Sequence, residues 1–521
     1  MDVRTLMRRS ARFHSQYPAV VEAGSVADGR PARRLTYAEA WGRGLRLANA
    51  LGSLGLQPGD RIGVLEDNTL ESVDFFCGTA AANLVRVPLY PRNGRDAHRH
   101  MLAHTGCRAL VVSQSHADAV AGIEDEVSSL DKVIVRGPDY EDWLSGFPDT
   151  DPDPPVEQDD WFIIRHTGGT TGRSKGVGYT HKTWLDAGRD WFYNLPPVEL
   201  GDVCQHAGPI SHGSGYLFTP IWLSGGVNLL IPKFDVDEVI ETMESERVAY
   251  GFLVPAMLNA LVRHPTATER DWSHLKCIQI GGAPIADDTA LLAREVLGPC
   301  LYQGYGQTEA LPITMMGPTE WFSEIEGSNP LRSAGRPLPF GDLEIVDPET
   351  GRPLAVGEEG EIAIRCDGQM SGFWENPEAT AERMRDGWVL TGDIGKLDDN
   401  GYLYVLDRKD DMIISGGFNI WPAELENVLT DHPQVVEAAV FGVPSERWGE
   451  SPSAVVTVVE GATVTEDELI ALCADRLGSY KRPVAVVLTT DELPKSPVGK
   501  LARKTLREPH WQGHDRRVAG N

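Results

Sequence analysis

The sequence is poor in features that would define several whole classes of protein. Its seven cysteines are scattered over 521 residues, and no C-x-x-C pair occurs. Neither a disulfide framework nor a zinc site is therefore indicated. No apolar run is long enough to span a bilayer, and the N-terminal residues lack the apolar stretch of a signal peptide. We expect a cytoplasmic protein whose cysteines are buried as small apolar residues.

Positive charge is also scarce. The 48 lysines and arginines are outnumbered by 76 aspartates and glutamates, which gives a formal net charge of −28. So acidic a chain is not expected to bind nucleic acid or anionic membranes through general electrostatic attraction. Because the acidic residues are spread along the chain, we interpret them as a solvated surface. A nucleotide can still bind where cations are concentrated locally.

The apolar pattern predicts alternating strands and helices. Buried strands are expected at 61–65, 85–89, 109–113, 161–164, 227–231, 250–253 and 277–280. Helices are expected from Thr36, which opens a capping box, and at 72–84, 96–105, 182–192, 236–245 and 256–263. This spacing is typical of βαβ units and implies a parallel sheet covered on both faces.

The pattern changes in the last third of the chain. It becomes β-rich from about Ala334, and Asp399-Asn-Gly401 is typical of a hairpin turn. After position 410 it resets, with helices from Pro422 and Thr465 and strands at 454–459 and 484–489. We therefore predict an α/β fold: a large N-terminal domain, 1–409, of layered α/β subdomains with a β-rich portion, and a small α+β C-terminal domain, 410–521. Residues 508–521 are expected to form a loose tail.

A stretch rich in glycine and hydroxyl residues follows the apolar run 161–164. It runs from Thr167 to Gly176 and includes the cations Arg173 and Lys175. Backbone N–H groups turned inward by glycines, together with hydroxyls and cations, suit the phosphates of a nucleotide. The stretch is not a P-loop, because Ser174 rather than glycine precedes the lysine. An exposed surface turn is the alternative.

Seven further motifs accompany this loop. They are His212-Gly-Ser-Gly215, Gly281-Gly-Ala-Pro284, Tyr305-Gly-Gln-Thr-Glu309, Thr391-Gly-Asp393, Asp407-Arg-Lys-Asp410, Ser415-Gly-Gly-Phe-Asn419 and Pro494-Lys-Ser-Pro-Val-Gly-Lys500. In this order they resemble the adenylate-forming superfamily, which comprises acyl- and aryl-CoA ligases, stand-alone adenylation domains and firefly luciferase. The chain departs from that pattern at His166, Gly168 and Ser174, where the superfamily often has an aromatic residue, serine and proline.

The resemblance implies how a nucleotide would be held. Residues Thr167, Gly168, Gly169, Thr170, Thr171, Gly172 and Lys175 would bind the β- and γ-phosphates. Tyr305 and Gly306 would adjoin the adenine, with Gly281, Gly282, Ala283 and Pro284 on the other side. Asp393 and Arg408 would bind the ribose, Thr308 would donate to the α-phosphate, and Glu309 would be the Mg²⁺ ligand. The alternatives are a helix-terminal charge for Glu309, a core tyrosine for Tyr305, and a structural ion pair for Asp393 and Arg408.

The resemblance also implies a moving C-terminal domain. Lys500 would bridge the substrate carboxylate and the α-phosphate, unless it is an ordinary solvated lysine. Asp410 would be the hinge about which the domain turns between two half-reactions. That turn would bring Ser415, Gly416 and Gly417 to the site, where they would form the CoA channel. His212 and Gly213, with Gly281 and Gly304, would line the acid pocket.

The activity implied is that of an ATP-dependent carboxylic acid–CoA ligase, which forms acyl-AMP and pyrophosphate and then acyl-CoA and AMP. Because glycine at 281 and 304 leaves room, and Trp191-Phe192-Tyr193 can cap a pocket, an aromatic acid of benzoate, cinnamate or naphthoate type is favoured over a medium- or long-chain fatty acid. No buried cation or acid that would select an amino acid is evident.

Three alternative functions remain open at this point. They are a stand-alone enzyme that loads a carrier protein, a luciferase-like oxygenase, and a non-catalytic nucleotide-binding scaffold. The sequence does not indicate the pathway or the oligomeric state.

Overall fold

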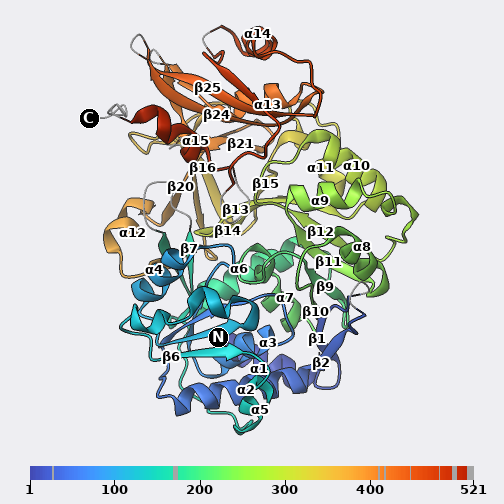
Figure 1. Cartoon of the computed structure of the whole chain (residues 1–521), viewed down its shortest axis with the longest axis vertical. Helices are drawn as coiled ribbons and strands as arrows, with labels where there is room; N and C mark the ends of the chain where they lie inside the picture. The colour runs from blue at the N-terminus through green and yellow to red at the C-terminus, as the bar shows by residue number, and fades with distance from the viewer. Residues whose placement is uncertain are drawn as a thin grey trace. The chain divides into compact units, whose positions relative to one another are not determined.

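A computed structural model describes residues 1–25, 29–167, 174–408, 411–415, 418–445, 448–479, 481–495 and 501–512 (Figure 1). The chain forms two compact units. The first comprises Met1–Leu343, Ile364–Val389 and Asp399–Leu403, and the second comprises Glu344–Ala363, Leu390–Asp398 and Tyr404–Asn521. The predicted α/β fold is confirmed.

The first unit contains a nine-stranded sheet in the order β15-β14-β13-β12-β11-β9-β10-β1-β2. Its strands are β1 (Pro18–Glu22), β2 (Arg33–Thr36), β9 (Val203–His206), β10 (Val227–Leu230), β11 (Val248–Leu253), β12 (Cys277–Ile280), β13 (Leu301–Gln307), β14 (Ala310–Met316) and β15 (Arg336–Pro337). Six neighbouring strands run parallel: β13, β12, β11, β9, β10 and β1. Strands β2, β14 and β15 are antiparallel to their neighbours.

A seven-stranded sheet in the order β18-β8-β7-β4-β3-β5-β6 also belongs to the first unit. Its strands are β3 (Arg61–Leu65), β4 (Val85–Pro88), β5 (Ala109–Ser113), β6 (Lys132–Arg136), β7 (Trp161–Thr167), β8 (Lys175–Thr180) and β18 (Gly372–Phe373). Five neighbouring strands run parallel, as the βαβ spacing predicted: β6, β5, β3, β4 and β7. Strand β8 runs antiparallel to β7, which the sequence did not predict.

The helices of the first unit cover these sheets. They are α1 (Val3–Phe13), α2 (Tyr37–Ser53), α3 (Ser72–Ala81), α4 (Arg95–Thr105), α5 (Tyr140–Ser145), α6 (His181–Asn194), α7 (Phe218–Leu223), α8 (Val236–Ser245), α9 (Pro255–Val262), α10 (Asp287–Leu297), α11 (Pro318–Trp321) and α12 (Pro377–Arg383), with 3₁₀ turns η1 (Gln114–Val120), η2 (Ile123–Asp125), η3 (Gly213–Tyr216), η4 (Ala267–Glu269) and η5 (Pro330–Arg332). The capping box predicted at Thr36 is present.

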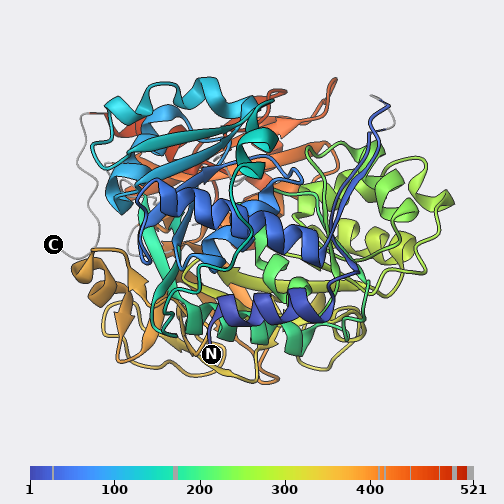
Figure 2. The same cartoon turned by 90° about the horizontal axis from the view of Figure 1, so that it is seen from below.

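Helices α1, α2 and α3 pack against one another (Figure 2). The approach of α2 to α3 depends on Gly44, because a Cβ there would lie 2.3 Å from the Cβ of Cys77. Helix α1 was not predicted, although Asp2 caps its N-terminus and its apolar residues face the core.

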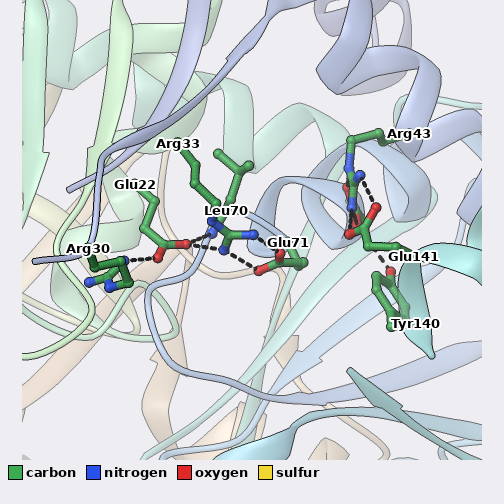
Figure 3. Close-up of polar contacts among 9 residues, drawn as sticks. Glu22, Arg30, Arg33, Arg43, Leu70, Glu71, Tyr140 and Glu141 are labelled. Atoms are coloured by element: carbon green, nitrogen blue, oxygen red, sulfur yellow. Dashed lines mark hydrogen bonds and ion pairs between the residues drawn. The ribbon is translucent and has the colours of Figure 1, made fainter. Parts of the chain in front are cut away.

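A buried carboxylate connects the first two strands of the nine-stranded sheet to the residues just before α3 (Figure 3). Glu22, at the end of β1, accepts hydrogen bonds from Arg30 and Arg33 and from the backbone N–H of Leu70 at 2.8 Å. Arg33 also donates to both carboxylate oxygens of Glu71 at 2.6 and 3.1 Å. Burial alone would raise the pKa of Glu71, but the hydrogen bonds and charge of Arg33, together with hydrogen bonds from the Glu71 backbone and Thr69, outweigh burial and lower the pKa to about 2. The network therefore fastens β1 and β2 to the start of α3.

The second unit contains a sheet in the order β23-β22-β25-β24, with β26 beside β25. Its strands are β22 (Ile413–Ser415), β23 (Phe418–Ile420), β24 (Val435–Ser445), β25 (Gly449–Val458) and β26 (Val486–Thr489), and its helices are α13 (Pro422–Thr430), α14 (Glu466–Leu477) and α15 (Arg503–Arg507), followed by η7 (Glu508–Trp511). Leu425, Val440, Val456 and Leu469 are buried in its core. The elements predicted after position 410 are therefore present.

A further sheet has the order β16-β17-β20-β19, with β21 beside β20. Its strands are β16 (Gly341–Val346), β17 (Gly360–Cys366), β19 (Met384–Arg385), β20 (Trp388–Leu397) and β21 (Leu403–Arg408). Strands β16, β17 and β20 each contain a point where the chain passes from one unit to the other. The predicted β-rich portion lies here.

The prediction of a loose tail from position 508 is wrong for its first residues. They form η7, in which the indole N–H of Trp511 donates to the carbonyl of Gly442 at 2.9 Å and the ring of His510 packs against Phe441. A tryptophan this near the chain end favours docking, because it buries a large apolar area.

All seven cysteines are unpaired thiols, and six of them are buried, as expected. Burial raises the pKa of Cys107 to about 12. Among the described residues, no helix is long and apolar enough to cross a membrane.

Candidate functional site

The glycine-hydroxyl loop connects the antiparallel strands β7 and β8. Thr167 and Lys175 are partners in the ladder, so the two ends of the loop are held side by side. The Nζ atom of Lys175 lies 5.3 Å from the ring centroid of Phe373 on β18. The remaining predicted phosphate ligands, Gly168, Gly169, Thr170, Thr171 and Gly172, lie outside the described residues.

Tyr90 connects the predicted acid-binding histidine to this loop. Its hydroxyl donates to the backbone carbonyl of His166, the residue before Thr167. Its ring meets the ring of His212 edge-on, with centroids 5.0 Å apart. Burial raises the pKa of Tyr90 to about 12, so the hydroxyl remains a neutral donor. His212, which directly precedes η3, is thereby brought next to the strand that leads into the loop.

Histidines of α4 contact both ends of the loop. The Nε2 atom of His100 lies 2.9 Å from the carbonyl oxygen of Ser174, and Nδ1 of His104 lies 3.4 Å from Nε2 of His166. Burial, with smaller contributions from His104 and His100, lowers the pKa of His166 to about 3, so this ring is neutral. The i, i+4 spacing of His100 and His104 was the available signal for this cluster, and the sequence analysis missed it.

A buried cation, Arg165, lies on β7, two residues before Thr167. Its side chain is almost completely inaccessible to solvent, and its guanidinium lies 4.1 Å from the ring centroid of Tyr216. It donates to the carbonyl of Ser211 at 3.3 Å. The sequence analysis did not identify this buried cation, and its contacts with Tyr216 and Ser211 do not indicate an amino acid substrate. The sequence around Arg165 does not indicate which residues its side chain will contact.

Thr308 and Glu309 occupy the corner between β13 and β14. The hydroxyl of Tyr179 donates to the carbonyl of Thr308 at 2.7 Å, and the N–H of Met370 donates to the carbonyl of Glu309 at 2.8 Å. The Glu309 side chain is buried, and Oε1 lies 3.7 Å from Nη2 of Arg383. The corner is thus fixed through its backbone.

Of the glycines predicted to line the acid pocket, Gly213 and Gly281 lie next to Phe252, and Gly304 lies next to Gly281. A Cβ at 213 would lie 3.0 Å from the Phe252 ring, and one at 281 would lie 3.4 Å from that ring and 2.9 Å from the carbonyl oxygen of Gly304. A Cβ at 304 would make only ordinary contacts, of which that with the Met315 methyl is 3.8 Å. Glycine at 281 is therefore required by the neighbouring backbone, and only glycine at 304 leaves room.

The predicted adenine-binding residues follow two parallel neighbours, β12 and β13. Gly282, Ala283 and Pro284 are exposed just beyond β12, and Tyr305 and Gly306 lie at the end of β13, with Tyr305 partly buried. In open α/β sheets, ligands bind in the crevice beyond the carboxyl ends of such strands. The position of both segments is typical of a nucleotide site.

An aromatic cavity of about 450 Å³ lies beside η3, between α1, α6 and α7. Its lining includes Trp184, Trp191, Phe192 and Tyr216, and the rings of Trp184 and Tyr216 stack with centroids 5.4 Å apart. Tyr193, expected to act with its two neighbours, is instead 61% exposed. The aromatic run thus contributes two of its three rings to this cavity.

The second unit contains the predicted ribose and CoA residues. Asp393 is buried, and its N–H donates to the Thr391 hydroxyl at 3.1 Å. Arg408 ends β21, the neighbour of β20, and Ser415 pairs with Phe418 and Gly449. The Arg408 side chain, Asp410, Gly416, Gly417 and Lys500 lie outside the described part of the chain.

An α/β body of this kind, in which Tyr90 contacts both His212 and the strand leading into a glycine-hydroxyl loop, and which is followed by a small C-terminal unit, is typical of an adenylate-forming enzyme. The sequence model of the AMP-binding enzyme family matches residues 7–374, and that of the AMP-binding enzyme C-terminal domain matches residues 424–500. The chain belongs to the AMP-binding enzyme family.

Full-length similarity extends to known ligases. The chain is 39% identical over 508 residues to the feruloyl-CoA synthase of an Amycolatopsis species, covering 96% of this chain and 97% of that protein. It is 32% identical over 510 residues to the medium/long-chain-fatty-acid–CoA ligase FadD8 of Mycobacterium tuberculosis, covering 93% and 87%.

Among solved structures, the crystal structure of ATP-bound MatB from Rhodopseudomonas palustris is similar, with a TM-score of 0.87, 29% identity and coverage of 99% and 100%. The predicted enzyme class, an AMP-forming acid–CoA ligase, is confirmed.

Proposed function

We propose that this ligase activates an aromatic carboxylic acid in two half-reactions. A carboxylate oxygen attacks the α-phosphorus of ATP, and the bond to pyrophosphate breaks. The thiolate sulfur of CoA then attacks the acyl carbon, and the carbon–oxygen bond to AMP breaks. Both steps build negative charge, so fixed donors and cations supply most of the catalysis.

The contact of His212 with Tyr90 carries this proposal. Because Tyr90 also holds the carbonyl of His166, the acid-binding segment and the start of the phosphate loop are fixed to the same side chain. A carboxylate beside His212 is then close to a nucleotide whose phosphates lie on Thr167 and Lys175. Proximity of this kind is a large part of the rate enhancement in group transfer.

Glu309 fits a magnesium ligand. Its carboxylate is a hard oxygen donor, buried at a fixed corner. No group of three or more histidine, cysteine or acidic side chains among the described residues is arranged to hold a metal. This agrees with Mg²⁺, which is commonly held by one or two carboxylates together with substrate phosphates and water. When bound, the ion would neutralise charge on the phosphates, and Thr308 would donate to the α-phosphate.

The C-terminal domain, with its boundary at Asp410, is proposed to serve both half-reactions. Lys500 would stabilise the charge at the carboxylate and α-phosphate in the first. Rotation about Asp410 would then replace it with Ser415, Gly416 and Gly417, whose small size lets a pantetheine arm pass. Asp393 and Arg408 would hold the ribose.

The preference for an aromatic acid is supported by Gly304, where an added Cβ would make only ordinary contacts with Thr314 and Met315. The similarity to a feruloyl-CoA synthase favours the same class, whereas the similarity to FadD8 keeps a medium- or long-chain fatty acid as the second candidate. Transfer to a carrier protein and a cytoplasmic location remain predictions.

Pyrophosphate release across a panel of acids tests the proposal. The panel contains benzoates, hydroxycinnamates, naphthoates and alkyl acids of two to sixteen carbons, each assayed with CoA and with a phosphopantetheinylated carrier protein. We expect kcat/KM to be highest for an aromatic acid with CoA. A higher value for the long alkyl acids contradicts the aromatic assignment, and turnover only with the carrier protein contradicts the thiol assignment.

A further inference from the structure

Arg503 forms an ion cluster with two carboxylates inside the second unit. Its Nε and Nη2 atoms donate to the two oxygens of Glu426 at 2.7 and 2.5 Å, and its Nη1 atom donates to Asp411 at 3.1 Å. All three side chains are 13 to 16% exposed. Such two-pronged arginine–carboxylate bonds are among the strongest and most directional in proteins. The cluster therefore fixes the position of Arg503 closely.

The residues of this cluster come from three separate places in the sequence. Asp411 directly follows the proposed hinge, Glu426 lies in α13, and Arg503 begins α15, three residues after Lys500. Arg503 therefore joins the segment that follows the catalytic lysine to the residue that follows the hinge.

These bonds help to hold helix α15, which also packs against β24. It has five residues, too few to be stable in isolation. Its link to the preceding chain is short, since the Ala502 N–H donates to the Pro494 carbonyl at 2.8 Å and Lys495 forms an antiparallel bridge with Leu501. A displacement of Arg503 would therefore also displace Leu501, the residue next to Lys500.

The hairpin proposed to form the CoA channel is held differently. Ile413 pairs with Ile420, and Ser415 pairs with Phe418 and with Gly449 of β25. These are backbone ladder bonds, and Arg503 takes no part in them. The hairpin is therefore held by ladder bonds of its own in addition to its chain connection to Asp411 and α13.

We propose that Arg503 is a positioning residue for the adenylation half-reaction. It holds the segment that carries Lys500 to Asp411 and Glu426, so that the lysine moves with the hinge-side residue as one body. This inference rests on the proposed role of Lys500. It assigns to Arg503 no contact with substrate.

Arg503→Met tests the inference, with Lys504→Met as the matched control, because Lys504 is the next residue of the same helix and its side chain is 49% exposed. Adenylation is measured as acid-dependent ATP–pyrophosphate exchange, and thiol transfer as acyl-CoA formed from supplied acyl-adenylate. We expect Arg503→Met to lower kcat of exchange at least tenfold and thiol transfer less than twofold. Arg503→Lys should recover part of the exchange, because it restores the charge without the two-pronged geometry. Lys504→Met should leave both reactions within twofold of the wild type.

An equal fall in both reactions, or no fall in exchange, overturns the inference. If Arg503→Met fails to fold, Arg503→Lys and Glu426→Gln replace it. Both must then lose more exchange than thiol transfer, and the inference is overturned if they do not. A wild-type enzyme without acid-dependent exchange would instead contradict the proposed function, so the two failures are distinguishable.

Discussion

Gly304→Ala should narrow the acid pocket without disturbing the fold. The new methyl would lie 3.6 Å from the Thr314 carbonyl oxygen and 3.8 Å from the Met315 methyl, which are ordinary contact distances. Any fall in kcat/KM would then arise because the methyl occupies space that the substrate needs. One methyl too many in a close-fitting pocket costs about 1–3 kcal/mol. This corresponds to a decrease of roughly 5- to 150-fold in kcat/KM.

The assay compares two acids of different width in the same variant. We expect kcat/KM for the best aromatic acid to fall about tenfold or more, while that for propionate stays within twofold. Gly281→Ala is the contrasting variant, because its methyl would lie 2.9 Å from the Gly304 carbonyl oxygen and must displace backbone. It should lower activity towards both acids and also lower the melting temperature. If Gly304→Ala affects propionate and the aromatic acid equally, Gly304 does not line the acid pocket.

Three further predictions address the proposed catalytic residues and the stability of the first unit. Lys500→Ala should lose most acid-dependent ATP–pyrophosphate exchange yet still transfer a supplied acyl-adenylate to CoA; equal loss of both contradicts the two-conformation scheme. Glu309→Gln keeps the shape but removes the charge, so the Mg²⁺ concentration for half-maximal exchange should rise about tenfold, and an unchanged Mg²⁺ dependence would exclude the ligand role. Because the folded-state pKa of Glu71 is lowered from 4.5 to about 2, its ion pair with Arg33 stabilises the fold above pH 4.5 and is lost as the pH falls from 4.5 towards 2. Over this pH range, the free energy of unfolding measured with urea should fall by about 1–2 kcal/mol less in Glu71→Gln than in the wild type. This difference is reduced by solvent screening, because Arg33 is 44% exposed. Identical pH dependence of the two proteins would refute the assignment.

Much of the fold was predictable because its signals are local. The strand at 61–65 and the helix at 236–245 match β3 and α8 residue for residue, since apolar spacing and caps act over a few positions. The direction of β8 was not predictable. Its sequence, Lys175-Gly-Val-Gly-Tyr-Thr180, contains two glycines and has no period of its own. It becomes a strand through pairing with β7, which is a tertiary effect.

For the candidate site, the sequence indicated individual residues but not the side chains around them. Motifs named His212, Gly304 and Glu309, but not the side chains that position them. Tyr90 lies 122 residues before His212 in the sequence, and nothing near either residue indicates that their rings meet. Arg165 was missed for the same reason.

The docking of Trp511 bears on aggregation. Among the strands that the structure describes, β24 is the last of its sheet, and only β25 pairs with it. On that strand, the N–H of Val440 donates to the Glu426 carboxylate at 2.8 Å, and the carbonyl of Gly442 accepts the Trp511 indole N–H. Residues two apart in a strand direct these groups to the same side, so a carboxylate and an indole occupy hydrogen-bonding positions that another chain could otherwise use. A truncation before Trp511 would therefore expose a hydrogen-bonding position on this sheet edge and favour aggregation. Affinity tags should be placed beyond this residue.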